Sequence, residues 1–297
     1  MAAIGAAWLC VGCASTSASY EGQRTFTSAE AAVEGMAEAM RRDDVATLEA
    51  IFGDNAGEAI SSGDATADRA LREVFLVAFE KEWTLDAVTR SSRELVVGHE
   101  RWPFPIPIVK DSRGWWFDTA AGREEVLARR IGRNELATID AMRTYVFAQR
   151  EYASEARDGG APGAFAQQIV SDPGRRNGLY WPTEPDEAPS PLGDFASRAS
   201  GEGYGDGAGV YYGYAYRVLT SQGPDAPGGA MDYIVNGAMT KGFALIAHPV
   251  EYGNSGVMTF IINQDGVAYE SDLGPDTAGA AGAIDSYNPG AGWAVVE

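Results

Sequence analysis

The hydrophobic pattern of this chain passes from helical to strand spacing in two successive rounds, and this order constrains the fold more than any other feature. Apolar residues recur at three-and-four spacing between residues 29 and 80, and they alternate with a period of two after residue 82. A second helical stretch covers residues 123–149, and period-two segments return from residue 212 onward. Helices followed by antiparallel strands in both rounds predict an α+β fold with two domains, over residues 26–131 and 132–297.

The first domain is predicted to begin with three helices. Thr27 and Glu30 have the spacing of a capping box, which marks a helix start. Asp43 or Asp44 can cap a second helix, and Asp64 can cap a third. Strands are expected over 83–87, 95–97, 106–108 and 115–117, with a hairpin turn at 111–114. Three prolines around residue 106 place that segment at a sheet edge, because proline has no amide donor.

The second domain is predicted to begin with two helices, one over 123–131 and one capped by Asn134. Glycine, proline, aspartate and serine dominate residues 158–209, so few apolar residues are available there to protect the backbone. Asp265 and Gly266 predict a two-residue type I′ turn, with Phe260 and Ile262 facing the core. Further strands are expected over 212–218, 233–235, 243–245 and 257–267.

The two cysteines of the chain both lie near its beginning. Cys10 and Cys13 end an apolar stretch that is too short to span a bilayer, which is typical of a signal peptide. The sequence around Cys13 resembles a bacterial lipobox, although no basic residue precedes the apolar stretch. The resemblance implies a lipidated Cys13 after a signal peptide over 1–13, then a flexible tether over 14–25. An ordinary cleaved signal or a frayed tail is the alternative.

Charge and cysteine usage exclude several classes of function. The chain has 23 basic and 42 acidic residues, for a net charge of −19. This balance argues against binding to nucleic acid and against electrostatic docking on anionic lipid, because both need a basic surface. No cysteine follows residue 13, so the folded part has no disulfide, no thiol nucleophile and no cysteine-bound zinc.

Several segments of the chain carry a specific family resemblance. They include WPFPIPIVKDSRGWWFDTAAGREEVLARRIGRNEL, GGAMDYIVNG and YGNSGVMTFIINQDGVAYESDLG. In these segments the chain resembles the bacterial lipoprotein family called domain of unknown function 2950, over nearly everything after residue 25. The family has no established activity, so the resemblance implies a cell-envelope location and brings no catalytic residues with it.

Two further resemblances concern the fold alone. The segment AAVEGMAEAMRRDDVATLEAIFGD resembles the first two helices of the nuclear-transport-factor-like, or cystatin-like, superfamily, in which helices and an antiparallel sheet form a cone. The helix and small antiparallel sheet of the second domain resemble the globular part of bacterial pseudopilins. A pilin's leading hydrophobic helix and its processing site are missing here, so the resemblance implies no polymerisation through that helix.

No complete catalytic motif is present, and we predict no catalytic residue. His99 and His248 are the only histidines, and each is expected to be structural or exposed. Ser255 lies between strands and lacks the last glycine of a nucleophile elbow. The glycine-rich segment 201–207 follows no apolar strand, so a surface loop is expected rather than a phosphate site.

Calcium is the one metal that the acidic composition suggests, with no other cofactor. The spacing of a calcium-binding loop is absent, but four candidate ligands lie around the last hairpin: Asp265, Glu270, Asp272 and Asp276. Candidate ligand-binding residues of the first domain are two aromatic residues and two carboxylates on its strands: Trp102, Trp116, Asp86 and Asp118. A tyrosine row over 211–216 could stack on sugar rings, although packing is the commoner use of such residues.

Two hypotheses of function remain after these exclusions. The first is a lipid-anchored protein on the periplasmic side of the cell envelope, with the outer membrane favoured because Ala14 follows Cys13. It would act as a non-catalytic binding or scaffold module for an envelope protein or polymer. The second is a small-molecule binder or hydrolase that uses the cone of the first domain. The two differ in whether carboxylates such as Asp86 and Asp118 point into that cone.

Overall fold

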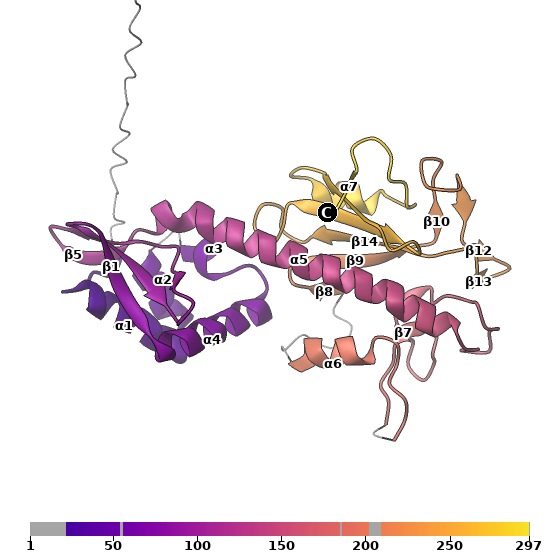
Figure 1. Ribbon diagram of the computed structural model, residues 1–297, viewed down its shortest axis with the longest axis horizontal. Helices are drawn as coiled ribbons and strands as arrows, with labels where there is room; N and C mark the ends of the chain where they lie inside the picture. Colours follow the sequence, from indigo (N-terminus) through magenta and orange to yellow (C-terminus); the bar gives the residue numbers. More distant parts are fainter. Residues whose placement is uncertain (1–21, 54–55, 185, 202–208, 297) are drawn as a thin grey trace, which may run out of the picture.

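The computed structural model describes residues 22–53, 56–184, 186–201 and 209–296, and it confirms the α+β fold class (Figure 1). The N-terminal part and the C-terminal part each pair helices with an antiparallel sheet. The long helix α5 (Thr119–Ala153) runs from one part into the other. Each part has its own cluster of buried apolar residues, so the molecule is built around two cores.

The N-terminal part begins with helices α1 (Ala29–Arg41), α2 (Val45–Phe52), α3 (Ala56–Ile60) and α4 (Ala65–Lys81). Asp44 and Asp64 cap α2 and α4, as predicted, because each carboxylate accepts a hydrogen bond from the third amide after it. The cap of α1 is Ser28 and not Thr27, since the hydroxyl of Ser28 accepts a hydrogen bond from the amide of Ala31. The short helix α3 was not predicted.

The first sheet follows these helices and has the strand order β1-β2-β4-β5, with β3 also paired to β2. Its strands are β1 (Trp83–Thr89), β2 (Ser92–Val97), β3 (Trp102–Pro103), β4 (Ile108–Asp111) and β5 (Gly114–Phe117). The predicted hairpin at 111–114 is present, because Asp111 pairs with Gly114. The predicted strand over 106–108 begins only at Ile108. Ile106 is buried under α5, and a Cβ on Gly122 would lie 2.7 Å from its Cα atom.

Helix α5 is continuous, so the prediction of two helices over 123–131 and from Asn134 was wrong. Asn134 lies inside α5 and caps nothing. Its side-chain Nδ2 instead donates to the carbonyl oxygen of Ser255 at 2.8 Å, and the residue is 1 % exposed. The domain boundary placed between residues 131 and 132 therefore falls within this helix.

Other polar residues of α5 near Asn134 bond to the loop around Ser255 in the C-terminal part. One oxygen of Glu135 accepts from the amides of Val257 and Met258, both at 3.0 Å. Arg130 donates to the side-chain oxygen of Asn254. These contacts join residues more than 120 positions apart, and they fix the C-terminal sheet against the middle of α5.

The C-terminal part contains a six-stranded antiparallel sheet with the order β17-β16-β15-β14-β9-β8. Around it lie a two-stranded parallel sheet (β6 with β7) and two short antiparallel pairs (β10 with β11, β12 with β13). The elements are β6 (Gln168–Val170), β7 (Gly178–Tyr180), α6 (Gly193–Gly201), β8 (Val210–Tyr211), β9 (Tyr214–Leu219), β10 (Ser221–Gln222), β11 (Met231–Asp232), β12 (Ile234–Val235), β13 (Ala238–Met239), β14 (Ala244–Pro249), β15 (Met258–Asn263), β16 (Ala268–Asp272), α7 (Thr277–Gly282) and β17 (Ala294–Val295).

Both faces of the six-stranded sheet are covered. Helix α5 packs against β14 and β15, and α7 packs against β14. Phe260 and Ile262 are buried as predicted, but Ile261 between them is 1 % exposed and equally buried. Alternation along β15 therefore does not separate a core face from a solvent face, because a layer lies on each side.

The last hairpin differs from the predicted type I′ turn. Of its two predicted turn residues, only Gly266 has a positive φ, of +79°. The amide of Gly266 donates to the carbonyl oxygen of Asn263, so the turn has Gln264 and Asp265 at its centre. The side-chain oxygen of Asn263 also accepts from the amide of Asp265 at 3.1 Å. This side-chain bond stabilises the longer connection, with the glycine in the left-handed position after the turn.

Candidate functional site

The predicted ligand-binding residues of the N-terminal part do not share one site. Asp86 is exposed and pairs with Arg101 at 2.8 Å. Asp118 caps α5, since its carboxylate accepts from the amide of Ala121 at 3.1 Å. Trp116 is 3 % exposed. Trp102 is 43 % exposed, and the guanidinium of Arg129 lies 4.9 Å from its ring centre.

A cavity of about 190 Å³ lies between α2, α4, α5 and the loop after β3. Trp102 lines it, whereas Asp86, Asp118 and Trp116 do not. Among the described residues that line it, the one carboxylate is Asp68, whose two oxygens share the amide hydrogen of Ser62. The carboxylates that the cone hypothesis names, Asp86 on β1 and Asp118 at the start of α5, therefore do not line this cavity.

The four acidic residues proposed for calcium do not converge. Asp265 lies in the last turn, and Glu270 lies on β16 opposite β17. Asp272 accepts from the hydroxyl of Tyr252 at 3.2 Å, and Asp276 stands before the first residue of α7. Within the described ranges, no group of three histidine, cysteine, aspartate or glutamate side chains could hold a metal ion.

The other residues that the sequence singled out have structural contacts. His99 is exposed and lies 3.2 Å from the carboxylate of Glu82. The hydroxyl of Ser255 is fully buried and bonds with the backbone of Glu251, so it is not presented as a nucleophile. The Nδ1 atom of His248 lies 3.1 Å from the carbonyl oxygen of Pro249. Cys13 and most of the segment 201–207 lie outside the described residues.

A second and larger cavity lies in the C-terminal part, on the face of the sheet that α5 covers. It has a volume of about 460 Å³ and is bounded by α5, α6, β6, β7 and the strands β8, β9 and β14. We call it the tyrosine cleft and define it by its five aromatic residues, Tyr145, Tyr180, Phe195, Tyr211 and Tyr216. A volume of this size is typical of small-molecule sites.

Two tyrosines of the cleft, one on α5 and one on β9, have their hydroxyl groups engaged. The hydroxyl of Tyr145 donates to the carbonyl oxygen of Ala244 at 3.2 Å, and it accepts from Gln149 at 2.9 Å. The hydroxyl of Tyr216 lies 3.3 Å from the hydroxyl of Thr138 on α5. Burial raises the pKa of both phenols above their usual value. These groups therefore stay protonated near neutral pH and do not act as general bases.

The remaining walls of the cleft are mostly apolar. Phe195 and Tyr211 meet edge to face, with ring centres 4.9 Å apart. Ile169 on β6, Leu192 just before α6 and Val218 on β9 add to the apolar surface. Among the described residues of the lining, Arg217 alone is charged, and its guanidinium donates to the carbonyl oxygens of residues 281 and 284 near α7.

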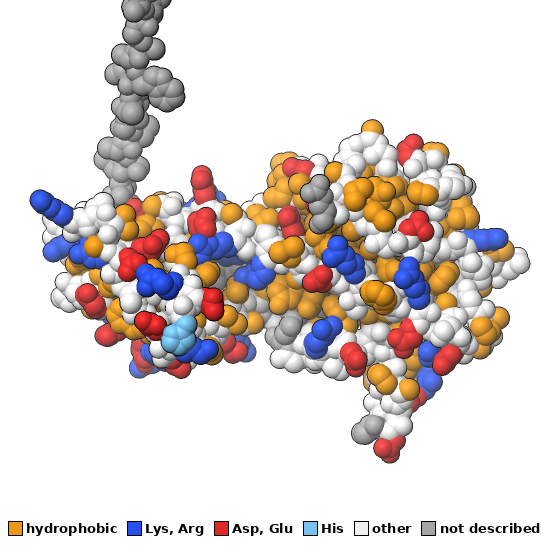
Figure 2. Space-filling model, in the orientation of Figure 1, with side chains coloured by type: hydrophobic (Ala, Val, Ile, Leu, Met, Phe, Trp, Pro, Cys, Tyr) orange, Lys and Arg blue, Asp and Glu red, His pale blue; other side chains and the backbone are white. Residues whose placement is uncertain are grey.

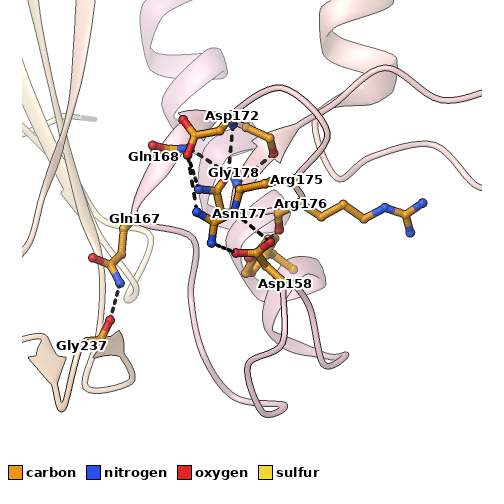
Figure 3. Close-up of polar contacts among 11 residues, drawn as sticks. Asp158, Gln167, Gln168, Asp172, Arg175, Arg176, Asn177, Gly178 and Gly237 are labelled. Carbon is orange, nitrogen blue, oxygen red and sulfur yellow. Dashed lines mark hydrogen bonds and ion pairs between the residues drawn. The ribbon is translucent and has the colours of Figure 1, made fainter.

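Two adjacent glutamines, Gln167 before β6 and Gln168 at its start, also line the cleft. Figure 3 shows that they are held in different directions. The Nε2 atom of Gln167 donates to the carbonyl oxygen of Gly237 at 2.8 Å. The Nε2 atom of Gln168 donates to the side-chain oxygen of Asn177 at 3.0 Å. Asn177 itself donates to the carboxylate of Asp172 at 2.7 Å, so this network fixes the loop between β6 and β7.

Sequence reasoning identified part of the cleft and missed the rest. It named the tyrosine row at 211–216, of which Tyr211 and Tyr216 line the cleft. It read residues 158–209 as poorly protected, yet Leu179 and Trp181 in this segment are buried and β6, β7 and α6 form cleft walls. The available signal was two short amphipathic pieces of sequence in that segment, over residues 165–170 and 192–199.

The surface around the two parts differs in character. In Figure 2, acidic and basic side chains lie interleaved over the N-terminal part, whereas apolar side chains cover more of the C-terminal part.

Among the described residues, no helix combines the length and the apolar character that crossing a membrane requires.

Comparison with known proteins gives a family and no activity. No curated protein and no solved structure matches the chain significantly, so the nuclear-transport-factor-like and pseudopilin-like folds stay predictions. One family model, described as a protein of unknown function (DUF2950), matches residues 23–296. This match covers the N-terminal part, α5 and the C-terminal part together. The chain therefore belongs to the DUF2950 family of proteins of unknown function.

Proposed function

We propose that this protein is a non-catalytic binding protein of the bacterial cell envelope, held on the periplasmic side of a membrane by a lipid on Cys13. The lipobox-like sequence before Cys13 supports the anchor, and Ala14 favours the outer membrane. The tyrosine cleft is the proposed binding site, and an envelope component is its proposed partner.

One observation carries the binding role. The tyrosine cleft has the volume of a ligand site, but its described lining contains no histidine, cysteine, lysine, aspartate or glutamate. Those side chains supply most general acids, bases and nucleophiles in enzymes. The hydroxyls of Tyr145 and Tyr216 are engaged by protein partners. A site of this composition favours binding over chemical conversion.

Anchoring is tested by replacing the proposed lipidated cysteine. Cys13→Ala should move the protein from the membrane fraction to the soluble fraction, because no thiol remains at that position to receive the lipid. Cys10→Ala is the matched control and should leave the protein in the membrane fraction. Membrane fractionation and metabolic labelling with palmitate measure both effects. Palmitate label that persists in Cys13→Ala would contradict the anchor.

Binding is tested on protein extracted from the envelope in mild detergent. Native mass spectrometry should detect a small molecule bound to the wild-type chain. The same molecule should not be bound to the Ala196→Trp variant, in which an indole from α6 fills the tyrosine cleft. The bound molecule should leave the protein chemically unchanged. A molecule that is retained equally by Ala196→Trp, or that is converted during incubation, would contradict the proposal.

A further inference from the structure

We infer that the protein forms a weak two-fold dimer, in which an exposed strip of α5 packs antiparallel against the same strip of a second copy. The α5 strip is defined by four residues, Leu136, Asp140, Arg143 and Phe147. The inference goes beyond the proposed function, because it depends on neither the anchor nor the tyrosine cleft. It follows from the exposure of these residues, from their order along the helix and from their charges.

The α5 strip is the side of the helix that faces away from the C-terminal sheet. Between residues 134 and 149, its four residues are the exposed ones, and the side chains between them are buried or half-buried. Positions that follow one another at intervals of four, three and four residues lie within about 60° around a helix, so they form one line about 16.5 Å long. Figure 1 shows α5 crossing the front of the C-terminal part.

Large apolar side chains stand at both ends of the strip. Leu136 is 67 % exposed and Phe147 is 69 % exposed. The exposed side of an amphipathic helix normally carries polar residues. Single exposed apolar residues are common on protein surfaces, but these two lie about three turns apart on the same side of one helix. A protein surface that covered both would remove them from water, which is favourable.

The order of the four residues fits a second copy of the same helix. Leu136 and Phe147 lie symmetrically about a point between residues 141 and 142, and Asp140 and Arg143 lie symmetrically about the same point. A two-fold interface between identical chains requires such an order, because each contact occurs twice with the residues exchanged. An axis through this point places Leu136 opposite Phe147 of the second copy, and Asp140 opposite Arg143 of the second copy.

The charges in the middle of the strip favour the same arrangement. Asp140 and Arg143 of one chain are 3.7 Å apart, and their side chains remain 81 % and 50 % exposed. Two copies bring together two carboxylates and two guanidinium groups, so the cluster is neutral and each carboxylate gains a second guanidinium. This local balance matters in a chain with a net charge of −19, because the copies otherwise repel each other.

The expected affinity follows from the size of this interface. One helix from each copy buries less than the area of about 1,200 Å² that stable complexes bury. The dimer should therefore be weak, with a dissociation constant on the order of 0.1 mM. The chain is then monomeric at the low micromolar concentrations of a denaturation experiment, and it dimerises when it is concentrated.

Sedimentation equilibrium measures the association of the full-length chain. Cys13→Ala is included, so that no attached lipid brings two chains together. The average mass should rise from that of a monomer toward that of a dimer between about 10 µM and 0.5 mM. Leu136→Ser and Phe147→Ser should each raise the dissociation constant at least about ten-fold, because each removes two apolar contacts from the dimer. Melting temperatures show that the variants are folded.

Charge reversal tests the pairing itself. Asp140→Arg and Arg143→Asp each place like charges opposite one another, and at low salt each should weaken the dimer at least about five-fold. An equimolar mixture of the two variants should dimerise again, because every strip charge of one chain then faces opposite charges of the other. A chain with both substitutions should dimerise like the wild type. Glu73→Arg, at an exposed position of α4, is the matched control and should leave the association unchanged.

Three results would overturn the inference. One is a wild-type chain that stays monomeric up to about 0.5 mM. If that chain binds vesicles of neutral phosphatidylcholine and Phe147→Ser does not, the strip contacts a membrane instead of a second copy. Another is association that the strip variants leave unchanged, which would place the interface elsewhere. The last is a mixture of Asp140→Arg and Arg143→Asp that regains no association, which would rule out the antiparallel pairing.

Discussion

Replacing Phe260 by alanine should lower the free energy of unfolding by about 3–5 kcal/mol. Phe260 lies on β15 and has no exposed surface. Its ring centre lies 5.9 Å from that of Tyr214, and α5 packs against the same strand. Removing the ring leaves a cavity between the sheet and α5 that these elements cannot close. Chemical denaturation monitored by circular dichroism measures the loss.

Phe147→Ala is the matched control for this experiment. Phe147 lies on α5 and is 69 % exposed, so the same substitution there removes little buried surface. It should change the free energy of unfolding by less than about 0.5 kcal/mol. Similar losses for the two variants would show that Phe260 does not pack in the core as described.

Replacing Gly132 by proline should cost about 3 kcal/mol or more and should bend α5 between the two parts. Gly132 lies inside this helix, where proline removes one backbone hydrogen bond and collides with the preceding turn. The variant should unfold at lower denaturant concentration. Small-angle X-ray scattering should also detect a changed radius of gyration, because the two parts are joined by this helix.

Gly132→Ala separates the backbone effect from any effect of a side chain at this position. A Cβ atom on Gly132 meets nothing within 4 Å, so alanine fits without a clash. It should stabilise the protein by about 0.5–1 kcal/mol, because alanine has less backbone freedom to lose on folding. A Gly132→Pro variant with unchanged stability and scattering would show that α5 is not one continuous helix.

The parts of the fold that the sequence predicts well depend on neighbouring residues. Asp44 and Asp64 cap helices because their carboxylates bond to amides three residues away. The hairpin at 111–114 likewise depends on a local turn. Such contacts are visible in a short window of sequence, and this is why the α+β class and the longer elements of the N-terminal part could be predicted.

The prediction for Asn134 failed because a distant residue supplies its partner. Asn134 has the character of a helix cap, but its amide bonds to Ser255, which is 121 residues away, and α5 continues past it. The turn before Gly266 failed for a local reason, because the side chain of Asn263 bonds to the amide of Asp265 and favours a longer turn than Asp-Gly alone suggests.

The tyrosine cleft is harder still to predict, since α5, β6, α6 and β9 contribute walls from widely separated segments. No local pattern contains that arrangement. The tyrosine row at 211–216 indicated one wall, but nothing in the sequence showed which other segments would face it.

The continuity of α5 sets a fixed spacing within the molecule. From Thr119 at its start to Tyr145 in the cleft, the helix rises about 39 Å at 1.5 Å per residue. A flexible connection of about twelve residues would instead give a fluctuating separation, with a root-mean-square span of only about 20 Å. The helix therefore holds the cleft at a set distance from the N-terminal part. Shortening α5 by whole turns would draw the cleft toward the N-terminal part by about 5.4 Å per turn, whereas replacing its middle by a flexible linker would let the two parts change their separation freely.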